Sequence, residues 1–300
     1  MLDQKRGLFV RIRVLLTVLA TLILALPHAA GTANAAIACD DSTAPPASPS
    51  ATPAMPDYPS FPEDGGDLHI MAAASLTDAF GEMERRLEEQ HPGLDITIET
   101  AGSQTLVTQI QSGAEADILA TADNVSMRSA MDAGLITGEP VTFTRNRLVI
   151  ATPADNPAGI ESINDLATDD ISLVLAGEDV PAGAYARTAL CAHAATTDGA
   201  SAWLDRVDAN TVSEEPDVRH VLTKLILGEA DAGIIYASDA AAAELAGTPL
   251  TVIELPDDVS VPATYPIAPV DGGNTDLALA FIGFALSDEG QAILAEYGFA

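Results

Sequence analysis

The alternation of apolar and polar positions along the chain predicts a succession of strands and helices. The first apolar run, Leu68–Ala74, is typical of a buried strand. The next segment, Asp78–Gln90, has helical periodicity, because Phe80, Met83 and Leu87 fall on one face. Repetition of this order through the rest of the chain predicts an α/β fold with parallel sheets covered on both faces.

The same criteria place the remaining elements. Further strands are expected at Leu94–Thr100, Asp117–Thr121, Arg147–Thr152, Ile171–Ala176, Ala232–Tyr236, Leu250–Leu255 and Tyr265–Val270. Helices are expected at Leu106–Ile110, Ser126–Ala133, Ser162–Ala167, Ala182–Ala194, Pro216–Leu227 and Ser238–Ala246, with one long helix or two within Asn274–Tyr297.

This many elements suit two α/β lobes better than one sheet. We expect the chain to cross between the lobes near Asn146 and again near Pro266. Residues 68–145 and 268–300 would then form lobe I, and residues 146–267 lobe II. Ligands of such folds bind at the carboxyl ends of strands, so a cleft between the lobes is the expected site.

The N-terminus has the pattern of an export signal. Basic residues precede the apolar run Val14–Leu26, which ends at Pro27; they are Lys5, Arg6, Arg11 and Arg13. The run is short for a membrane-spanning helix and fits the apolar region of a signal peptide. We therefore assign residues 1–38 as a signal peptide, with a single anchoring helix as the alternative.

Two processing sites compete after this segment. Ala33-Asn34-Ala35 fits ordinary signal cleavage, whereas Ala36-Ile37-Ala38-Cys39 resembles a lipobox in which Cys39 would carry lipid. Residues 39–67 are rich in proline and lack apolar periodicity, which predicts a disordered tether. A tether favours lipidation of Cys39. A disulfide from Cys39 to Cys191 is the alternative; we expect Cys191 instead to fill the core.

Charge excludes one class of partner. The chain carries 13 Lys+Arg against 44 Asp+Glu, for a net charge of -31. Nucleic-acid binding needs clustered basic residues, so no nucleic-acid partner is expected. The scattered histidines lack metal-ligand spacing, and neither a nucleotide-binding loop nor a hydrolase elbow occurs. We therefore expect no metal and no cofactor.

Several predicted helix starts share a feature that suits an anion. Ser75 and Ser103 follow strands, and Val180–Gly183 and Pro216–Val218 open two later helices. Helix N-termini offer unpaired N–H groups and partial positive charge, so several that converge would bind an anion without Lys or Arg. Taken singly, each is an ordinary capping or turn motif.

Ordered short motifs carry a family resemblance. They run from residue 68 to the C-terminus as Ala72–Thr77, Ala101–Ser103, Ala116–Ile118, Asn146–Val149, Val180–Ala186, Asp217–Arg219, Gly233–Ala240, Tyr265–Ala268 and Tyr297–Phe299. As a set they resemble the periplasmic molybdate-binding protein family, the substrate-binding components of molybdate ABC transporters.

The resemblance implies a two-lobed type II periplasmic-binding fold that holds molybdate or tungstate in its cleft. Ser75 and Ser103 would donate hydroxyl and backbone N–H bonds from lobe I. Ala182 and Val218 would donate backbone N–H groups from lobe II, and Tyr236 its phenol O–H. Gln104 stands where the family often has Ser, which leaves the neighbouring contact open. Molybdate is a dianion with acceptors only, so a set of neutral donors suits it.

The expected protein is therefore a binding protein and not an enzyme. Its partners would be the oxyanion, the permease of an ABC importer and, if Cys39 is acylated, the membrane; the protein would be a secreted, periplasmic or surface-bound monomer. One alternative is a receptor for tungstate or sulfate. Another is a secreted hydrolase with Ser75 or Ser103 as nucleophile, which would need a histidine base that no motif supplies.

Overall fold

The structure, a computed structural model, describes Ile37, Cys39 and residues 58–300. These residues belong to one compact unit. Apart from Ile37, the predicted signal peptide lies outside the described residues. So do residues 40–57 of the predicted tether.

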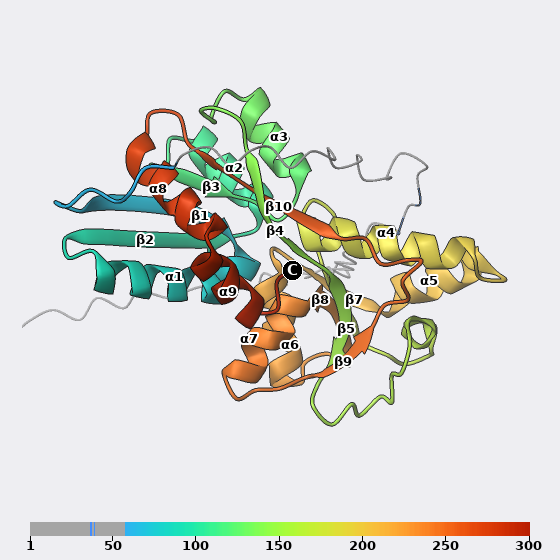
Figure 1. Cartoon of the computed structure of the whole chain (residues 1–300). Helices are drawn as coiled ribbons and strands as arrows, with labels where there is room; N and C mark the ends of the chain where they lie inside the picture. Colours follow the sequence, from blue (N-terminus) through green and yellow to red (C-terminus); the bar gives the residue numbers. More distant parts are fainter. Residues whose placement is uncertain (1–36, 38, 40–57) are drawn as a thin grey trace, which may run out of the picture. The chain divides into compact units, whose positions relative to one another are not determined.

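The first sheet has the strand order β2-β1-β3-β10-β4 (Figure 1). Its strands are β1 Gly66–Ala73, β2 Leu94–Ala101, β3 Ile118–Ala120, β4 Val141–Asn146 and β10 Ala263–Pro269. Strand β1 pairs in parallel with β2 and β3, but β10 runs antiparallel to β3 and β4. The expectation of purely parallel sheets is therefore wrong, because apolar runs reveal burial and not strand direction.

The second sheet has the order β7-β6-β8-β5-β9. Its strands are β5 Leu148–Thr152, β6 Leu173–Ala176, β7 Thr211–Glu215, β8 Ala232–Tyr236 and β9 Thr251–Glu254. Strand β6 is parallel to β7 and β8, whereas β5 is antiparallel to β8 and β9. Both sheets are thus mixed, each with parallel strands at one side and antiparallel strands at the other.

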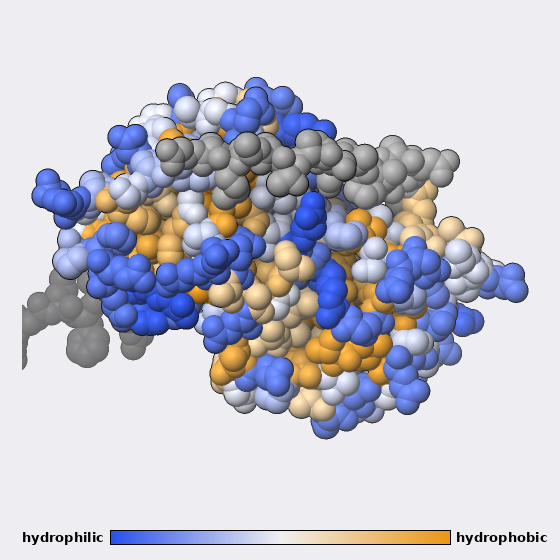
Figure 2. Space-filling model, in the orientation of Figure 1, coloured by the Kyte–Doolittle hydropathy of each residue, from blue (hydrophilic) through white to orange (hydrophobic). Residues whose placement is uncertain are grey.

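Helices connect and cover these strands. They are the 3₁₀ segments η1 Ala74–Leu76 and η2 Ile163–Ala167, and α1 Thr77–Gln90, α2 Ser103–Gln111, α3 Asn124–Asp132, α4 Pro181–Ala195, α5 Ala200–Asn210, α6 Val218–Leu227, α7 Ala237–Leu245, α8 Thr275–Leu286 and α9 Asp288–Glu296. Alternate residues of β1 face two clusters, with α1 and α8 on one face of the first sheet and α2 and α3 on the other. The outer side of α1 is hydrophilic (Figure 2).

Among the strands and α-helices of the described residues, three were not predicted. Strand β4 is half-exposed, and because most of its residues are polar it shows no alternation of apolar and polar positions. Helix α5 buries only Trp203 and Val207, too few for a recognisable apolar stripe. Strand β7 has buried residues only at its two ends, Thr211 and Glu215. In each case too few apolar positions mark the element.

The chain passes between the two sheets twice. The chain leaves the first sheet at Asn146 and enters the second at Leu148. It returns between Glu254 and Ala263, because β10 pairs in the first sheet from Ala263 onward. The return thus precedes Pro266. We call the parts built around the two sheets lobe I and lobe II.

The predicted tether is ordered where the structure describes it, which corrects the expectation of disorder over 39–67. Tyr58 and Phe61 pack against the core of lobe I, and the Phe61 ring lies 4.9 Å from that of His91. Strand β1 begins at Gly66. These aromatic side chains bury apolar surface, which favours an ordered segment although its proline-rich composition predicts disorder.

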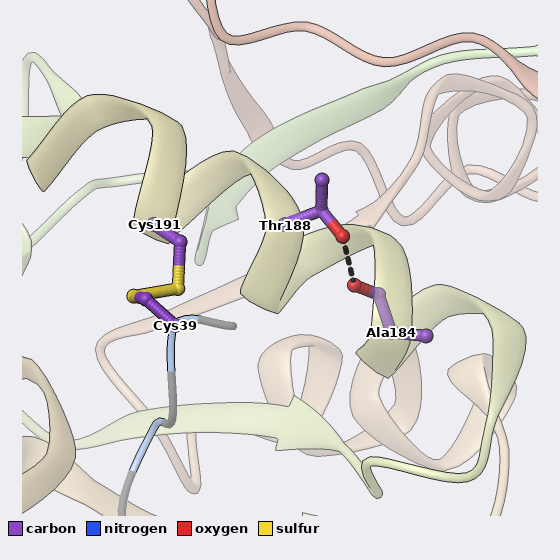
Figure 3. The surroundings of a disulfide bond; sticks show 4 residues. All are labelled: Cys39, Ala184, Thr188 and Cys191. Atoms are coloured by element: carbon purple, nitrogen blue, oxygen red, sulfur yellow. Dashed lines mark hydrogen bonds between the residues drawn. A yellow bond between two sulfur atoms is a disulfide. The ribbon is translucent and has the colours of Figure 1, made fainter. Parts of the chain in front are cut away.

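Cys39 forms a disulfide with Cys191 of α4 (Figure 3). Its sulfur therefore cannot carry a thioether-linked lipid, so the structure contradicts lipidation at Cys39. Cys191 is likewise a disulfide partner and not a core filler. The two cysteines are 152 residues apart, so only tertiary proximity reveals the pair.

No single helix in the described part of the chain is long and apolar enough to cross a membrane, although the bent pair α8–α9 meets the length and composition criteria together. Helix α8 buries Leu277, Phe281 and Ile282 in lobe I. Its apolar character thus reflects packing in the core.

Candidate functional site

All five residues predicted to bind ligand line one small pocket between the lobes. The lining consists of Ala73, Ala74, Ser75, Ala101, Gly102, Ser103, Ala122, Val180, Pro181, Ala182, Asp217, Val218 and Tyr236. The residues leave little open space between them, so the pocket in this form excludes a sugar or a peptide.

Backbone donors reach this pocket from three helix N-termini. Ser103 is the first residue of α2, Val218 the first of α6, and Ala182 the second of α4. The N–H groups of a first turn have no partner within their own helix. Pro181 starts α4 without an N–H, so Ala182 carries the first donor there. The positive ends of three helix dipoles therefore meet at one place.

Glycine permits the close packing at the start of α4. A Cβ added to Gly183 would lie 2.0 Å from the carbonyl oxygen of Gly177 and 2.3 Å from that of Ala176. Any larger residue would push the helix away from the end of β6. Gly183 thus positions the donor of Ala182.

The two serine hydroxyls are buried, and each has a partner on the protein side. The backbone N–H of Ala122 donates to Oγ of Ser103 at 3.0 Å. Oγ of Ser75 lies 2.8 Å from the phenol oxygen of Tyr265. Because each hydroxyl has one donor hydrogen and two lone pairs, each can make a further bond in the pocket.

Tyr236 ends β8 and is the N-cap residue of α7. Its side chain is 1% exposed, and its hydroxyl has no hydrogen-bond partner among the described residues. Burial raises the pKa of Tyr236 well above its ordinary value, so the phenol stays protonated and can donate at neutral pH. An unpaired buried hydroxyl costs free energy, which a ligand oxygen would recover.

The charged groups near the pocket serve the protein itself. The carboxylate of Asp217 caps α6: its Oδ1 accepts from the N–H groups of Arg219 and His220. No Lys, Arg or His is among the described residues that line the pocket. The serines therefore lack the histidine base that a hydrolase would need.

Gln104 lies outside the pocket. Its Nε2 donates to the carbonyl oxygen of Pro216 at 3.3 Å, a contact between lobe I and lobe II. A Cβ on Gly102 would lie 2.7 Å from the same oxygen. The departure from the family pattern at Gln104 thus affects the contact between the lobes and leaves Ser103 in the lining.

Two neighbouring residues were missed as parts of this region. Tyr265 contacts Ser75 although 190 residues separate them. Arg219, on α6, donates to the carbonyl oxygen of Ala74 at 3.3 Å and also bonds the carboxylate of Asp78, both in lobe I. Both residues stand in the motifs that carry the family resemblance, but no local pattern reveals their partners.

These features describe a solute-binding protein, and the comparisons with known proteins agree. Residues 68–300 match the family model for bacterial extracellular solute-binding proteins, and the chain belongs to that family. Family members bind solutes and are not enzymes, as expected from the sequence.

Within this class the resemblance to molybdate-binding proteins is confirmed. The chain is 34% identical over 244 residues to the molybdate-binding protein ModA of Mycobacterium tuberculosis, covering 81% of this chain and 88% of the relative. It is 33% identical to ModA of Escherichia coli, covering 79% and 90%. A third relative, 31% identical over 234 residues (77% of this chain and 85% of the relative), is a putative ABC transporter substrate-binding lipoprotein of Bacillus subtilis.

Solved structures support the two-lobed fold. The periplasmic molybdate-binding protein of Azotobacter vinelandii superposes with a TM-score of 0.68 at 18% identity, covering 78% of this chain and 98% of that one. The sulfate-binding protein SubI of Mycobacterium tuberculosis gives a TM-score of 0.68 at 20% identity, covering 78% and 86%. At these identities the likeness shows the fold alone.

Proposed function

We propose that this protein captures molybdate outside the cytoplasmic membrane and delivers it to the permease of an ABC importer, with tungstate as a second ligand. The observation that carries the proposal is the hydroxyl of Tyr236, which is buried in the pocket without a partner among the described residues. An oxyanion would accept from it and from the N-termini of α2, α4 and α6 at the same time.

The chemistry of the lining favours an anion that only accepts hydrogen bonds. Ser75, Ser103 and Tyr236 bring hydroxyl hydrogens, and Ala182 and Val218 bring N–H groups. The one carboxylate in the lining, that of Asp217, is engaged with α6. Molybdate and tungstate satisfy every such donor. Sulfate is also acceptor-only but smaller, so we expect weak binding.

The disulfide supports export. Disulfides such as Cys39–Cys191 form and persist in oxidising compartments, as found beyond the cytoplasmic membrane. Signal cleavage after Ala35 would leave Cys39 in the mature chain. The two α/β lobes would close on the anion, and the monomer would present the closed form to its permease.

Isothermal calorimetry with molybdate, tungstate, sulfate and phosphate tests the proposal. We expect one site per chain, tight binding of molybdate and much weaker binding of sulfate. Ligand should also raise the melting temperature, because it binds the folded state. Absence of both heat and thermal shift with molybdate and tungstate would refute the proposal. Tight sulfate binding without molybdate binding would assign the sulfate alternative.

A further inference from the structure

A chain of hydrogen bonds runs from the crossing between the lobes to the pocket. It begins at Asn146, the last residue of β4, continues to Tyr265 of β10 and ends at Ser75 in the pocket lining. All three side chains are buried, with exposed fractions of 3%, 0% and 3%. One donor in this chain has a fixed direction, and it orients the amide of Asn146.

That donor is the backbone N–H of Arg147, 2.9 Å from Oδ1 of Asn146. A backbone N–H cannot accept, so the atom facing it must be the amide oxygen. The amide nitrogen of Asn146 therefore faces the other way. It donates to Oγ of Ser238 at 2.8 Å and to the phenol oxygen of Tyr265 at 3.5 Å.

Tyr265 thus receives a hydrogen from Asn146 and has its own hydrogen left to donate. Its near partner is Oγ of Ser75, at 2.8 Å. Burial raises the pKa of Tyr265, which keeps that hydrogen on the phenol. Either oxygen of this pair can donate. With Tyr265 as the donor, Ser75 accepts from it and its own hydrogen is left for the pocket.

We propose that Tyr265 is a positioning residue that fixes the Ser75 hydroxyl as a donor, so that this corner of the pocket selects oxyanions without an O–H group. The inference rests on the proposed function and extends it to the basis of selectivity. A protonated anion such as hydrogen phosphate would bring its own hydrogen against that of Ser75. A hydroxyl free to rotate would accept it.

Ser103 provides an internal comparison. Its Oγ accepts from the backbone N–H of Ala122 at 3.0 Å, which leaves its own hydrogen available to donate into the pocket. Here the orienting donor belongs to the backbone and no side-chain substitution removes it. Loss of the Tyr265 hydroxyl should therefore release Ser75 and leave Ser103 unchanged.

The test is Tyr265→Phe, which keeps the ring packed against Phe143, Tyr236 and Phe299 and removes only the hydroxyl. We expect molybdate affinity to fall about tenfold, the scale of one hydrogen bond to a charged group. Phosphate affinity should be unchanged or higher, so the ratio of molybdate affinity to phosphate affinity should fall. The matched control is Tyr297→Phe, since Tyr297 does not line the pocket.

A double-mutant cycle separates positioning from packing. In a Ser75→Ala background the effect of Tyr265→Phe on molybdate should vanish, whereas in a Ser103→Ala background it should persist. Equal effects in both backgrounds, or an equal loss for molybdate and phosphate, would overturn the inference while the proposed function stands. Wild-type protein that fails to bind molybdate would overturn the proposed function itself.

Asn146→Asp offers a second variant. It keeps the acceptor for the N–H of Arg147 and replaces the donor that faces Tyr265 by an acceptor. Tyr265 would then donate to the new carboxylate, and Ser75 would donate back to Tyr265. We expect a larger loss of molybdate affinity than in Tyr265→Phe. Unchanged molybdate affinity in a variant that melts like the wild type would contradict the orienting role of the Asn146–Tyr265–Ser75 chain.

Discussion

Arg219 of lobe II and Asp78 of lobe I form an ion pair across the junction between the lobes. The same guanidinium donates from Nε to the carbonyl oxygen of Ala74, beside Ser75, and lies 3.0 Å from Oδ1 of the buried Asp239. Arg219 thus links the start of α1 to the starts of α6 and α7. Because the pair joins the two lobes, it contributes only when they are closed together.

Asp78→Asn should therefore weaken the closed state while the Arg219–Asp239 contact stays intact. Both side chains of the pair are partly exposed, so we expect a loss of about 1 kcal/mol, or roughly fivefold in affinity. The change should appear mainly as faster molybdate dissociation in stopped-flow measurements. Glu84→Gln on the same helix is the control. An unchanged dissociation rate in Asp78→Asn would mean that the pair does not hold the lobes together.

Tyr236→Phe should weaken ligand binding without lowering the stability of the unliganded protein. Loss of the phenol hydroxyl should weaken molybdate binding by about 1.5–3 kcal/mol, the range for a hydrogen bond to a charged group. Ser103→Ala should fall in the same range. The unliganded protein should melt at the same temperature or higher, because the variant lacks the unpaired buried hydroxyl. Calorimetry and thermal melting check both expectations, with Tyr297→Phe as the control outside the pocket lining. Wild-type affinity would remove Tyr236 from the site.

Asp239 makes stability depend on pH. Burial raises the pKa of this carboxyl to about 6; Arg219 and the N–H of Tyr236 oppose the rise, and Asp78 and Asp217 add to it. The pKa of Asp239 is near 4 in the unfolded chain and about 6 in the folded protein. Between about pH 4 and pH 6 the folded protein therefore binds more protons than the unfolded chain. The contribution of Asp239 to the free energy of unfolding thus falls as pH rises through that range. Asp239→Asn should remove a decline of about 3 kcal/mol in the free energy of unfolding over this pH range. Urea unfolding of both proteins from pH 4 to pH 7 measures it, and parallel profiles would contradict it.

The disulfide links Cys39 covalently to α4, which can be tested chemically. Native protein should contain no free thiol, and its intact mass should show Cys39 without lipid. Cys39→Ser or Cys191→Ser should each cost about 2–4 kcal/mol in the free energy of unfolding, because either change opens the same long loop. The double variant should lose no more than the single ones. A diacylglyceryl group found on Cys39 would contradict this pairing.

Local rules account for what the sequence alone determined. Apolar runs such as Ala232–Tyr236 are buried strands. Pro181 is the first residue of α4 and Asp217 the N-cap of α6, positions that suit a proline and an aspartate. These rules act within a few residues. They were sufficient to predict the α/β class, the order of most elements and helix starts around the pocket. The family resemblance supplied the five expected binding residues, all of which line the pocket, and the expected ligand.

Only the tertiary structure decided how distant residues meet. The antiparallel course of β10, the bond between Cys39 and Cys191 and the contact of Ser75 with Tyr265 join segments far apart in the chain. None of them has a periodic signal, because a strand, a cysteine or a tyrosine has the same local pattern whatever its partner. Packing of the two lobes selects the partners.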